Sequence, residues 1–159
     1  MLYFAYGSNL WKRGMLRRCP KAQPVAPARL AGYRLTFQGY ALIVPDPKGV
    51  VLGALYRLTP ADLRALDEYE EAPRLYRRVD ITVETDDGSA EAFIYLMNPD
   101  AARGLSPQPE PAYYGEIARG YNDWKLDPTV LRRARFGAMH DAGRRSSAGP
   151  GGTSEPPSR

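Results

Sequence analysis

The sequence has a single cysteine, Cys19, and a single histidine, His140. One cysteine cannot form a disulfide within the chain, and it excludes a cysteine-based zinc site. The sequence also has no apolar run that approaches the ~20 residues needed to span a bilayer. Its first residues, MLYFAYGSNLWKRG, lack the basic region, long apolar region and cleavage site of a signal peptide. We therefore expect a cytoplasmic protein without a membrane partner.

The sequence also lacks a concentrated basic stripe. The net charge is +4, and arginine pairs occur at 17–18, 77–78, 132–133 and 144–145. These pairs are scattered, and no RNA-binding signature joins them. We expect most of them to be solvated surface residues, with no nucleic-acid partner, although some could favour an acidic small substrate.

The end of the chain has no large apolar residue. From Asp141 it reads DAGRRSSAGPGGTSEPPSR, which is dense in glycine, serine and proline. Such a segment cannot bury enough surface to offset the entropy of ordering. The 159 residues therefore predict one domain over residues 1–140, with a single core, and a disordered tail over residues 141–159.

Residues 1–140 combine strands with a few helices. Apolar and β-branched runs predict strands at 2–5, 33–39, 41–44 and 49–58, and a hairpin over 79–97 that turns at Asp87-Gly88. Helices are predicted after Asn9, which would be the N-cap, within 59–73, and over 112–121 and 128–139. Helices and strands do not alternate regularly, so we expect a single α+β domain built on a small mixed β-barrel flanked by helices.

The segment TPADLRALDEYEEAP predicts a helix with a carboxylate on its apolar face. Thr59 is a candidate N-cap, Pro60 suits the first helical position, and Pro73 requires a stop. On a helical wheel, Glu70 lies only ~20° from Leu63 and ~40° from Leu66. Glu68 and Glu71 lie away from this stripe.

Two interpretations of Glu70 are open at this point. The first is structural: the last turn reaches water, or Glu70 pairs with Arg74, Arg77 or Arg78. The second is catalytic: a helix C-terminus and an apolar setting both raise the pKa of a carboxyl group, which suits a general base or acid near neutral pH.

The stretch YFAYGSNL places Gly7-Ser8-Asn9 between a predicted strand and a predicted helix. Small polar residues at such a junction are usually turn residues. The same junction can also present backbone N–H groups to an anion, and Gly7 allows a close approach. The tetrapeptide is neither a P-loop nor a G-x-S-x-G motif.

Four motifs occur together in a characteristic order: YFAYGSNL, LDEYE, LYRRVDITV and PAYYGEIARGY. In this order they resemble the γ-glutamylcyclotransferase (AIG2-like) family over nearly all of residues 1–125. The resemblance implies a small barrel with a pocket between barrel and helices. It also implies an enzyme of lyase or acyltransferase type that converts a γ-glutamyl amide into 5-oxoproline and a free amine, without cofactor or metal.

The resemblance also assigns site residues. It makes Glu70 the catalytic general base and acid, and places Tyr6, Gly7, Ser8, Asn9, Leu10, Tyr76 and Tyr113 at the substrate. Family members often have glycine directly after the catalytic glutamate, whereas this chain has Glu71.

The partner implied is a small γ-glutamyl compound, and the resemblance also allows a homodimer. γ-Glutamyl amino acids or amines are favoured over the glutathione-like peptides of glutathione metabolism, because relatives specific for those generally carry a different loop. Two alternatives stay open: removal of a γ-glutamyl protecting group in a biosynthetic pathway, and a binding module of the same fold without turnover.

Overall fold

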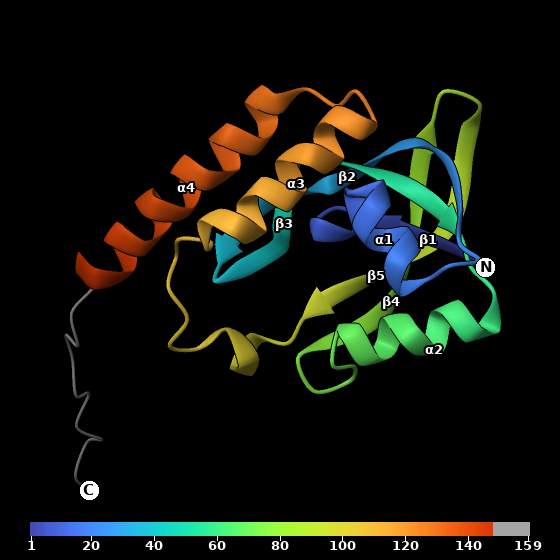
Figure 1. The fold of residues 1–159 in the computed structure, drawn as a ribbon. Coiled ribbons are helices and arrows are strands. Elements are labelled where there is room, and N and C mark those ends of the chain that lie inside the picture. The colour runs from blue at the N-terminus through green and yellow to red at the C-terminus, as the bar shows by residue number, and fades with distance from the viewer. Residues whose placement is uncertain (148–159) are drawn as a thin grey trace, which may run out of the picture.

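The computed structural model describes residues 1–147, in which five strands close into a barrel (Figure 1). The strands are β1 (Leu2–Ala5), β2 (Gln23–Gln38), β3 (Tyr40–Arg57), β4 (Tyr76–Thr85) and β5 (Gly88–Met97). They follow the order β1-β3-β2-β4-β5 around the barrel, and all neighbours are antiparallel except the parallel pair β1 and β5. This mixed barrel in a single domain confirms the predicted fold class.

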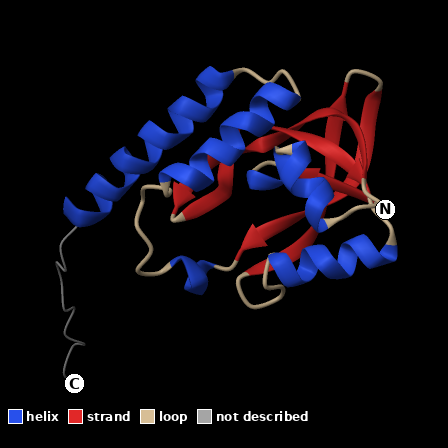
Figure 2. Cartoon of the chain, viewed as in Figure 1, coloured by secondary structure: helices blue, strands red, loops and turns tan. Residues whose placement is uncertain are grey.

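Helices lie around the barrel (Figure 2). They are the 3₁₀ turn η1 (Ser8–Leu10), α1 (Lys12–Arg18), α2 (Pro60–Tyr69), the 3₁₀ turn η2 (Pro99–Ala102), α3 (Pro111–Asp123) and α4 (Pro128–Ser147). In Figure 1, α3 and α4 lie side by side on one flank of the barrel, and α2 lies on the opposite flank. Helix α3 packs against η1, so it holds the turn that follows β1.

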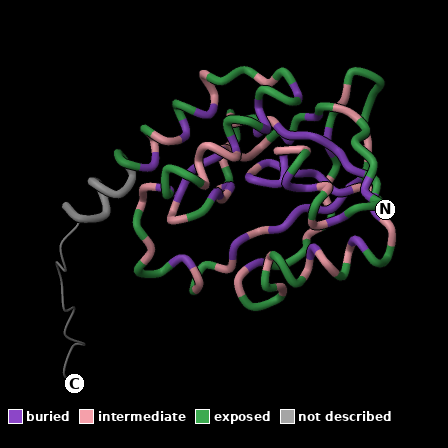
Figure 3. Tube along the Cα trace, viewed as in Figure 1, coloured by how far each residue is buried: buried purple, intermediate pink, exposed green. Residues whose placement is uncertain are grey.

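The core fills the inside of the barrel and the layer beneath the helices (Figure 3). Its largest fully buried side chains come from the strands, from η1 and from the inner faces of α1, α2 and α3; they include Phe4, Leu10, Met15, Tyr56, Leu66 and Ile117. Burial of such side chains contributes about 1.5–3 kcal/mol each to folding. This packing fixes the ends of β1 and α2 relative to each other.

Most predicted elements are confirmed, with different bounds. The hairpin forms, but its turn residues are Asp86 and Asp87, and Gly88 already begins β5. Helix α4 runs through residues 141–147, past the predicted end at Met139, so the first part of the predicted tail is helical. Residues 148–159 of that tail lie outside the described residues, and their disorder stays a prediction. Within residues 1–147, no helix is long and apolar enough to cross a membrane.

The predicted N-cap role of Asn9 is wrong. Asn9 lies inside η1, and Trp11 occupies the N-cap position of α1 without a side-chain capping bond. The Asn9 side chain is buried and contacts other polar side chains instead. A local capping pattern was therefore overridden by tertiary hydrogen bonds.

Candidate active site

Glu70 directly follows helix α2, and local hydrogen bonds fix both ends of this helix. At the start, Thr59 and Asp62 form a reciprocal capping box, as the sequence suggested for Thr59. At the end, the N–H of Glu71 donates to the carbonyl of Glu68 (3.1 Å), and the N–H of Ala72 donates to that of Asp67 (2.9 Å). This pair of bonds is a Schellman motif, which leaves Glu70 as the C-cap residue.

The Schellman motif explains why glycine suits the position after Glu70. The residue following a C-cap adopts a left-handed conformation, and Glu71 has φ of +50°. Glycine takes this conformation without steric cost, whereas other residues pay roughly 1 kcal/mol. Glu71 instead forms an ion pair with Arg74 at the surface.

The Glu70 side chain points toward the barrel. Leu66, one turn earlier, is fully buried, and Glu70 Oε1 accepts a hydrogen bond from Asn9 Nδ2 at 3.0 Å. The three arginines considered as surface partners bind elsewhere: Arg74 pairs with Glu71, Arg77 donates to Asn98 Oδ1, and Arg78 pairs with Asp67. The structure therefore does not support the surface ion-pair interpretation of Glu70.

Burial raises the pKa of Glu70 to about 7, from an ordinary value of 4.5. The positive charge of Arg18 and the hydrogen bond from Asn9 act in the opposite direction, but more weakly. The pKa thus shifts in the predicted direction. A carboxyl group with a pKa near neutrality can both accept and return a proton at physiological pH.

A cavity of about 230 Å³ opens beside Glu70. Of the predicted site residues, the cavity brings together Tyr6, Gly7, Ser8, Asn9, Glu70, Tyr76 and Tyr113. Its volume lies below the ~300–1,000 Å³ of pockets for drug-sized ligands, so it suits a small molecule.

Two of the predicted tyrosines bind the backbone of one residue, Ala41. The hydroxyl of Tyr76 donates to the carbonyl of Ala41 (3.1 Å), and the hydroxyl of Tyr113 accepts from the N–H of Ala41 (3.0 Å). The hydroxyl of Tyr6 donates to the carbonyl of Tyr95. Tyr113 consequently keeps its hydrogen for a ligand, whereas Tyr6 and Tyr76 offer acceptor oxygens.

These hydroxyls stay protonated at neutral pH. Burial raises the pKa of Tyr6, Tyr76 and Tyr113, and the neighbouring Glu70 carboxylate raises each of them further. Glu70 is therefore the group in this cluster whose charge changes near pH 7.

Leu10 lies elsewhere than predicted. Its side chain is fully buried in the core, and its carbonyl accepts hydrogen bonds from Trp124 Nε1 (2.9 Å) and from the Tyr56 hydroxyl (3.4 Å). Leu10 thus anchors the turn that carries Gly7, Ser8 and Asn9, and the structure gives no support to a ligand contact from its side chain.

Sequence reasoning missed several residues of the cavity wall: Tyr3, Tyr40, Ala41, Tyr69, Leu75 and Tyr95. Tyr3 had a detectable signal, because it lies in β1 three residues before Tyr6 and close to the loop motif. Tyr40 and Ala41 begin β3, and Tyr95 lies in β5, so barrel closure brings them here.

The lone cysteine and histidine lie outside this site. Cys19 is buried and donates to the carbonyl of Asp62, and burial raises its thiol pKa to about 11, which disfavours the thiolate. His140 is exposed on α4. Among the side chains described, those of residues 1–140, no group of three or more His, Cys, Asp or Glu is arranged to hold a metal ion.

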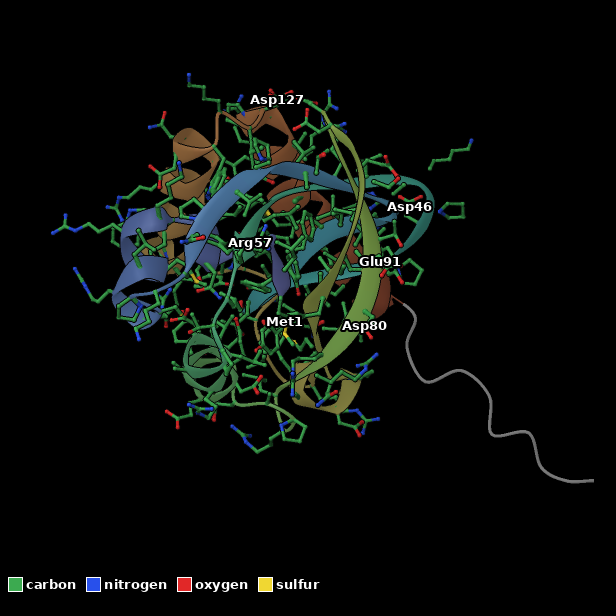
Figure 4. The ribbon with its side chains drawn as sticks, turned by 90° about the vertical axis from the view of Figure 1, so that its right-hand side faces the viewer. Met1, Asp46, Arg57, Asp80, Glu91 and Asp127 are labelled. Atoms are coloured by element: carbon green, nitrogen blue, oxygen red, sulfur yellow. The ribbon has the colours of Figure 1, made fainter. Side chains whose placement is uncertain are left out.

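A second hollow lies over β4 and β5, with Met1, Asp80 and Glu91 among its lining residues (Figure 4). It is larger, at about 700 Å³, but its lining contains no predicted site residue. The chemistry therefore concentrates in the smaller cavity.

The cavity in this barrel places a carboxyl group of near-neutral pKa among protonated tyrosines. Such a site belongs to the class of small-molecule sites that can carry out general acid–base chemistry. The family follows from comparison with known proteins. The chain belongs to the γ-glutamyl cyclotransferase, AIG2-like family, whose model matches residues 3–125.

Individual relatives agree with this assignment. The chain is 31% identical to human γ-glutamylcyclotransferase over 121 residues, which cover 67% of this chain and 64% of the human protein. It is 32% identical to the bovine protein of the same name over 132 residues, covering 75% and 69%. The match thus spans less than two thirds of the human protein's length.

Solved structures share the fold. One named γ-glutamyl cyclotransferase superposes with a TM-score of 0.73 at 27% identity, covering 85% of this chain and 86% of the other. YkqA from Bacillus subtilis gives a TM-score of 0.68 at 25% identity, covering 96% of this chain and 56% of that one.

Proposed function

We propose that this protein is a γ-glutamyl cyclotransferase that releases 5-oxoproline and a free amine from a γ-glutamyl amide. The observation that carries the proposal is Glu70, a carboxyl group with a pKa of about 7, held at 3.0 Å from Asn9 in the wall of a small cavity. The names of the human and bovine relatives support the same activity.

In this reaction the substrate's own α-nitrogen attacks its γ-carbonyl carbon. The new C–N bond closes a five-membered ring, and the bond from the same carbon to the leaving nitrogen breaks. The α-nitrogen starts as an ammonium with three hydrogens and ends as a lactam N–H, so it loses two protons. The leaving nitrogen gains two and departs as an ammonium. Glu70 carries these protons in turn, and the reaction needs no protein nucleophile and no cofactor.

The polar groups of the cavity suit such a substrate. Glu70 and the acceptor oxygens of Tyr6 and Tyr76 offer partners to an ammonium group. Backbone N–H groups of Gly7, Ser8 and Asn9, together with the free hydrogen of Tyr113, would hold the α-carboxylate or the developing oxyanion. Holding the substrate folded back on itself supplies a further rate advantage through proximity.

The test is 5-oxoproline release from a panel of γ-glutamyl amino acids and γ-glutamyl amines. We expect turnover by the native protein and a loss of at least about 100-fold in Glu70→Gln, which keeps the shape and removes the base. Glu68→Gln is the matched control, because Glu68 is exposed on the same helix. The panel also decides between catabolic substrates and a γ-glutamyl protecting group on a larger amine.

Three results would count against the proposal. Equal turnover in the native protein and Glu70→Gln would remove Glu70 from the chemistry, and Glu71→Gln would be examined next. Binding of panel members without turnover would indicate a binding module. The absence of both binding and turnover across the panel would exclude γ-glutamyl compounds of these classes.

A further inference from the structure

We propose that Arg18 is a positioning residue of this site: its guanidinium fixes the orientation of the Asn9 amide, and through it the hydrogen bonding and charge of Glu70. This inference deepens the proposed function and rests on it for the role of Glu70. It concerns a residue in α1 that does not line the cavity described above.

Arg18 is the last residue of α1, yet its side chain turns inward and is only 20% exposed. Three contacts from three different elements hold it. Its Nη1 donates to Asn9 Oδ1 at 2.8 Å, its guanidinium carbon lies 3.9 Å from the centre of the Tyr69 ring, and its Nη2 lies 4.0 Å from Glu116 Oε2. A guanidinium held on several sides presents its donors in a fixed direction.

The chemistry of arginine then determines which way the Asn9 amide faces. Arginine has only donors, so the Asn9 oxygen must face Arg18. The two hydrogens on Asn9 Nδ2 therefore face the other way, toward Glu70 Oε1 (3.0 Å) and the Tyr3 hydroxyl (3.1 Å). In the flipped orientation, the amide oxygen would face the carboxylate of Glu70, which repels it.

Both effects of Arg18 on Glu70 have the same sign. Its positive charge favours the ionised carboxylate, and so does the hydrogen bond that it orients. These two effects oppose burial, which raises the Glu70 pKa. Removing the guanidinium should therefore raise the Glu70 pKa above about 7 and leave less of the base ionised at neutral pH.

The other groups around Glu70 do not replace Arg18. Titratable or charged side chains from the elements around the site are Tyr3 and Tyr6 near β1, Tyr40 in β3, Asp67 and Tyr69 in α2, Glu71 in the following loop, Tyr76 and Arg78 in β4, Tyr95 in β5, and Tyr113 and Glu116 in α3. Apart from Arg78, these are phenols or acids, and Arg78 pairs with Asp67. Arg18 is the cation whose charge favours the ionised Glu70 carboxylate.

The test combines a carboxyl titration with a pH–rate profile. In ¹³C-labelled protein, the Glu70 carboxyl resonance is assigned by its loss in Glu70→Gln and followed against pH. We expect Arg18→Met, whose unbranched side chain can still cover Tyr69, to move the Glu70 midpoint upward by about one pH unit or more. The acid limb of 5-oxoproline release should move with it, giving about a tenfold lower rate at pH 6.

Two further variants separate charge from a general loss of structure. Arg17→Met is the matched control, because Arg17 is the preceding residue of the same helix but is exposed. In this variant, the midpoint of the Glu70 carboxyl titration and the midpoint of the acid limb of the pH–rate profile should both stay at their native values. Arg18→Lys keeps the positive charge and a hydrogen-bond donor, so its Glu70 titration midpoint should lie closer to the native value than that of Arg18→Met. If Arg18→Met does not fold, Arg18→Lys and Arg18→Gln give the same comparison between retained and lost charge.

A double-mutant cycle tests the positioning itself. In an Asn9→Ala background only the direct charge effect of Arg18 is left, so Arg18→Met should move the Glu70 midpoint by less than it does with Asn9 present. Equal movement in both backgrounds would overturn the positioning role.

An unchanged midpoint in folded Arg18→Met would overturn the whole inference, and so would a rate that falls equally at every pH. Failure of the proposed function is distinguishable from these results. If the native protein releases no 5-oxoproline, the carboxyl titration still decides the role of Arg18.

Discussion

Replacing Glu70 by glutamine should make the folded protein more stable, and increasingly so as the pH rises. The folded pKa of Glu70 lies at about 7, above the ordinary value of 4.5 that applies to the unfolded chain. A carboxyl whose pKa is raised on folding contributes full stability below pH 4.5, and this contribution is lost as the pH rises through 7. Glutamine cannot ionise, so the Glu70→Gln variant does not lose this stability as the pH rises.

The two pKa values set the size of this effect. They differ by about 2.5, and each pKa unit corresponds to about 1.4 kcal/mol, so ionised Glu70 costs the fold on the order of 3 kcal/mol at pH 8. At pH 5 the cost is only about 1 kcal/mol, because the folded carboxyl is still mostly protonated there. The pH-dependent gain in Glu70→Gln between pH 5 and pH 8 is thus about 2 kcal/mol.

Urea unfolding of the native protein and Glu70→Gln at pH 5, 6, 7 and 8 measures this gain. The difference between the two proteins isolates Glu70, because every other titrating group is common to both. Loss of other contacts of Glu70 would add a constant offset without a pH dependence. Glu68→Gln, at an exposed position on the same helix, should show a much smaller slope. A difference between native protein and Glu70→Gln that is flat from pH 5 to pH 8 would falsify the buried-carboxyl argument.

Two further changes test how the site is supported. Gly120→Ala places a Cβ 2.4 Å from Leu10 Cβ and 2.7 Å from the backbone nitrogen of Trp11, so we expect a free energy of unfolding lower by about 1–3 kcal/mol and a higher KM from a displaced Gly7–Asn9 turn. The control is Gly115→Ala, on the same helix but with open space around its Cβ. Equal stability and equal KM in the two variants would contradict the packing argument. Thr59→Ala removes the N-cap of α2 and should lower the free energy of unfolding by about 1 kcal/mol. We expect kcat to stay near the native value, because the cap lies at the opposite end of α2 from Glu70. A large fall in kcat with unchanged stability would contradict this expectation and show that the cap affects the site itself.

Local signals in the sequence predicted the parts of the fold that local physics controls. The cap at Thr59, the helix that follows it and the β4–β5 hairpin depend on neighbours in the chain. The direction in which Glu70 points also followed, because helical periodicity places it in line with Leu66. The resemblance to the family then identified half of the cavity wall, seven of its fourteen residues.

The remaining features depend on contacts between distant segments. Asn9 has the residue type of an N-cap, but Arg18, Glu70 and Tyr3 together offer it better hydrogen bonds inside the protein. Leu10 follows the loop motif, but its side chain is buried in the core, and Trp124, more than a hundred residues later, binds its carbonyl. Such outcomes depend on barrel closure, which residue spacing does not reveal.

The backbone of Ala41 has a consequence for how this site can be studied. At the start of β3, its carbonyl holds Tyr76 from β4, and its N–H holds Tyr113 from α3. A shift of this hairpin would therefore displace two walls of the cavity together. Because any residue except proline supplies the same N–H and carbonyl, alanine scanning and sequence alignments are blind to this shared support, and only a backbone substitution such as an ester or a proline at position 41 would expose it.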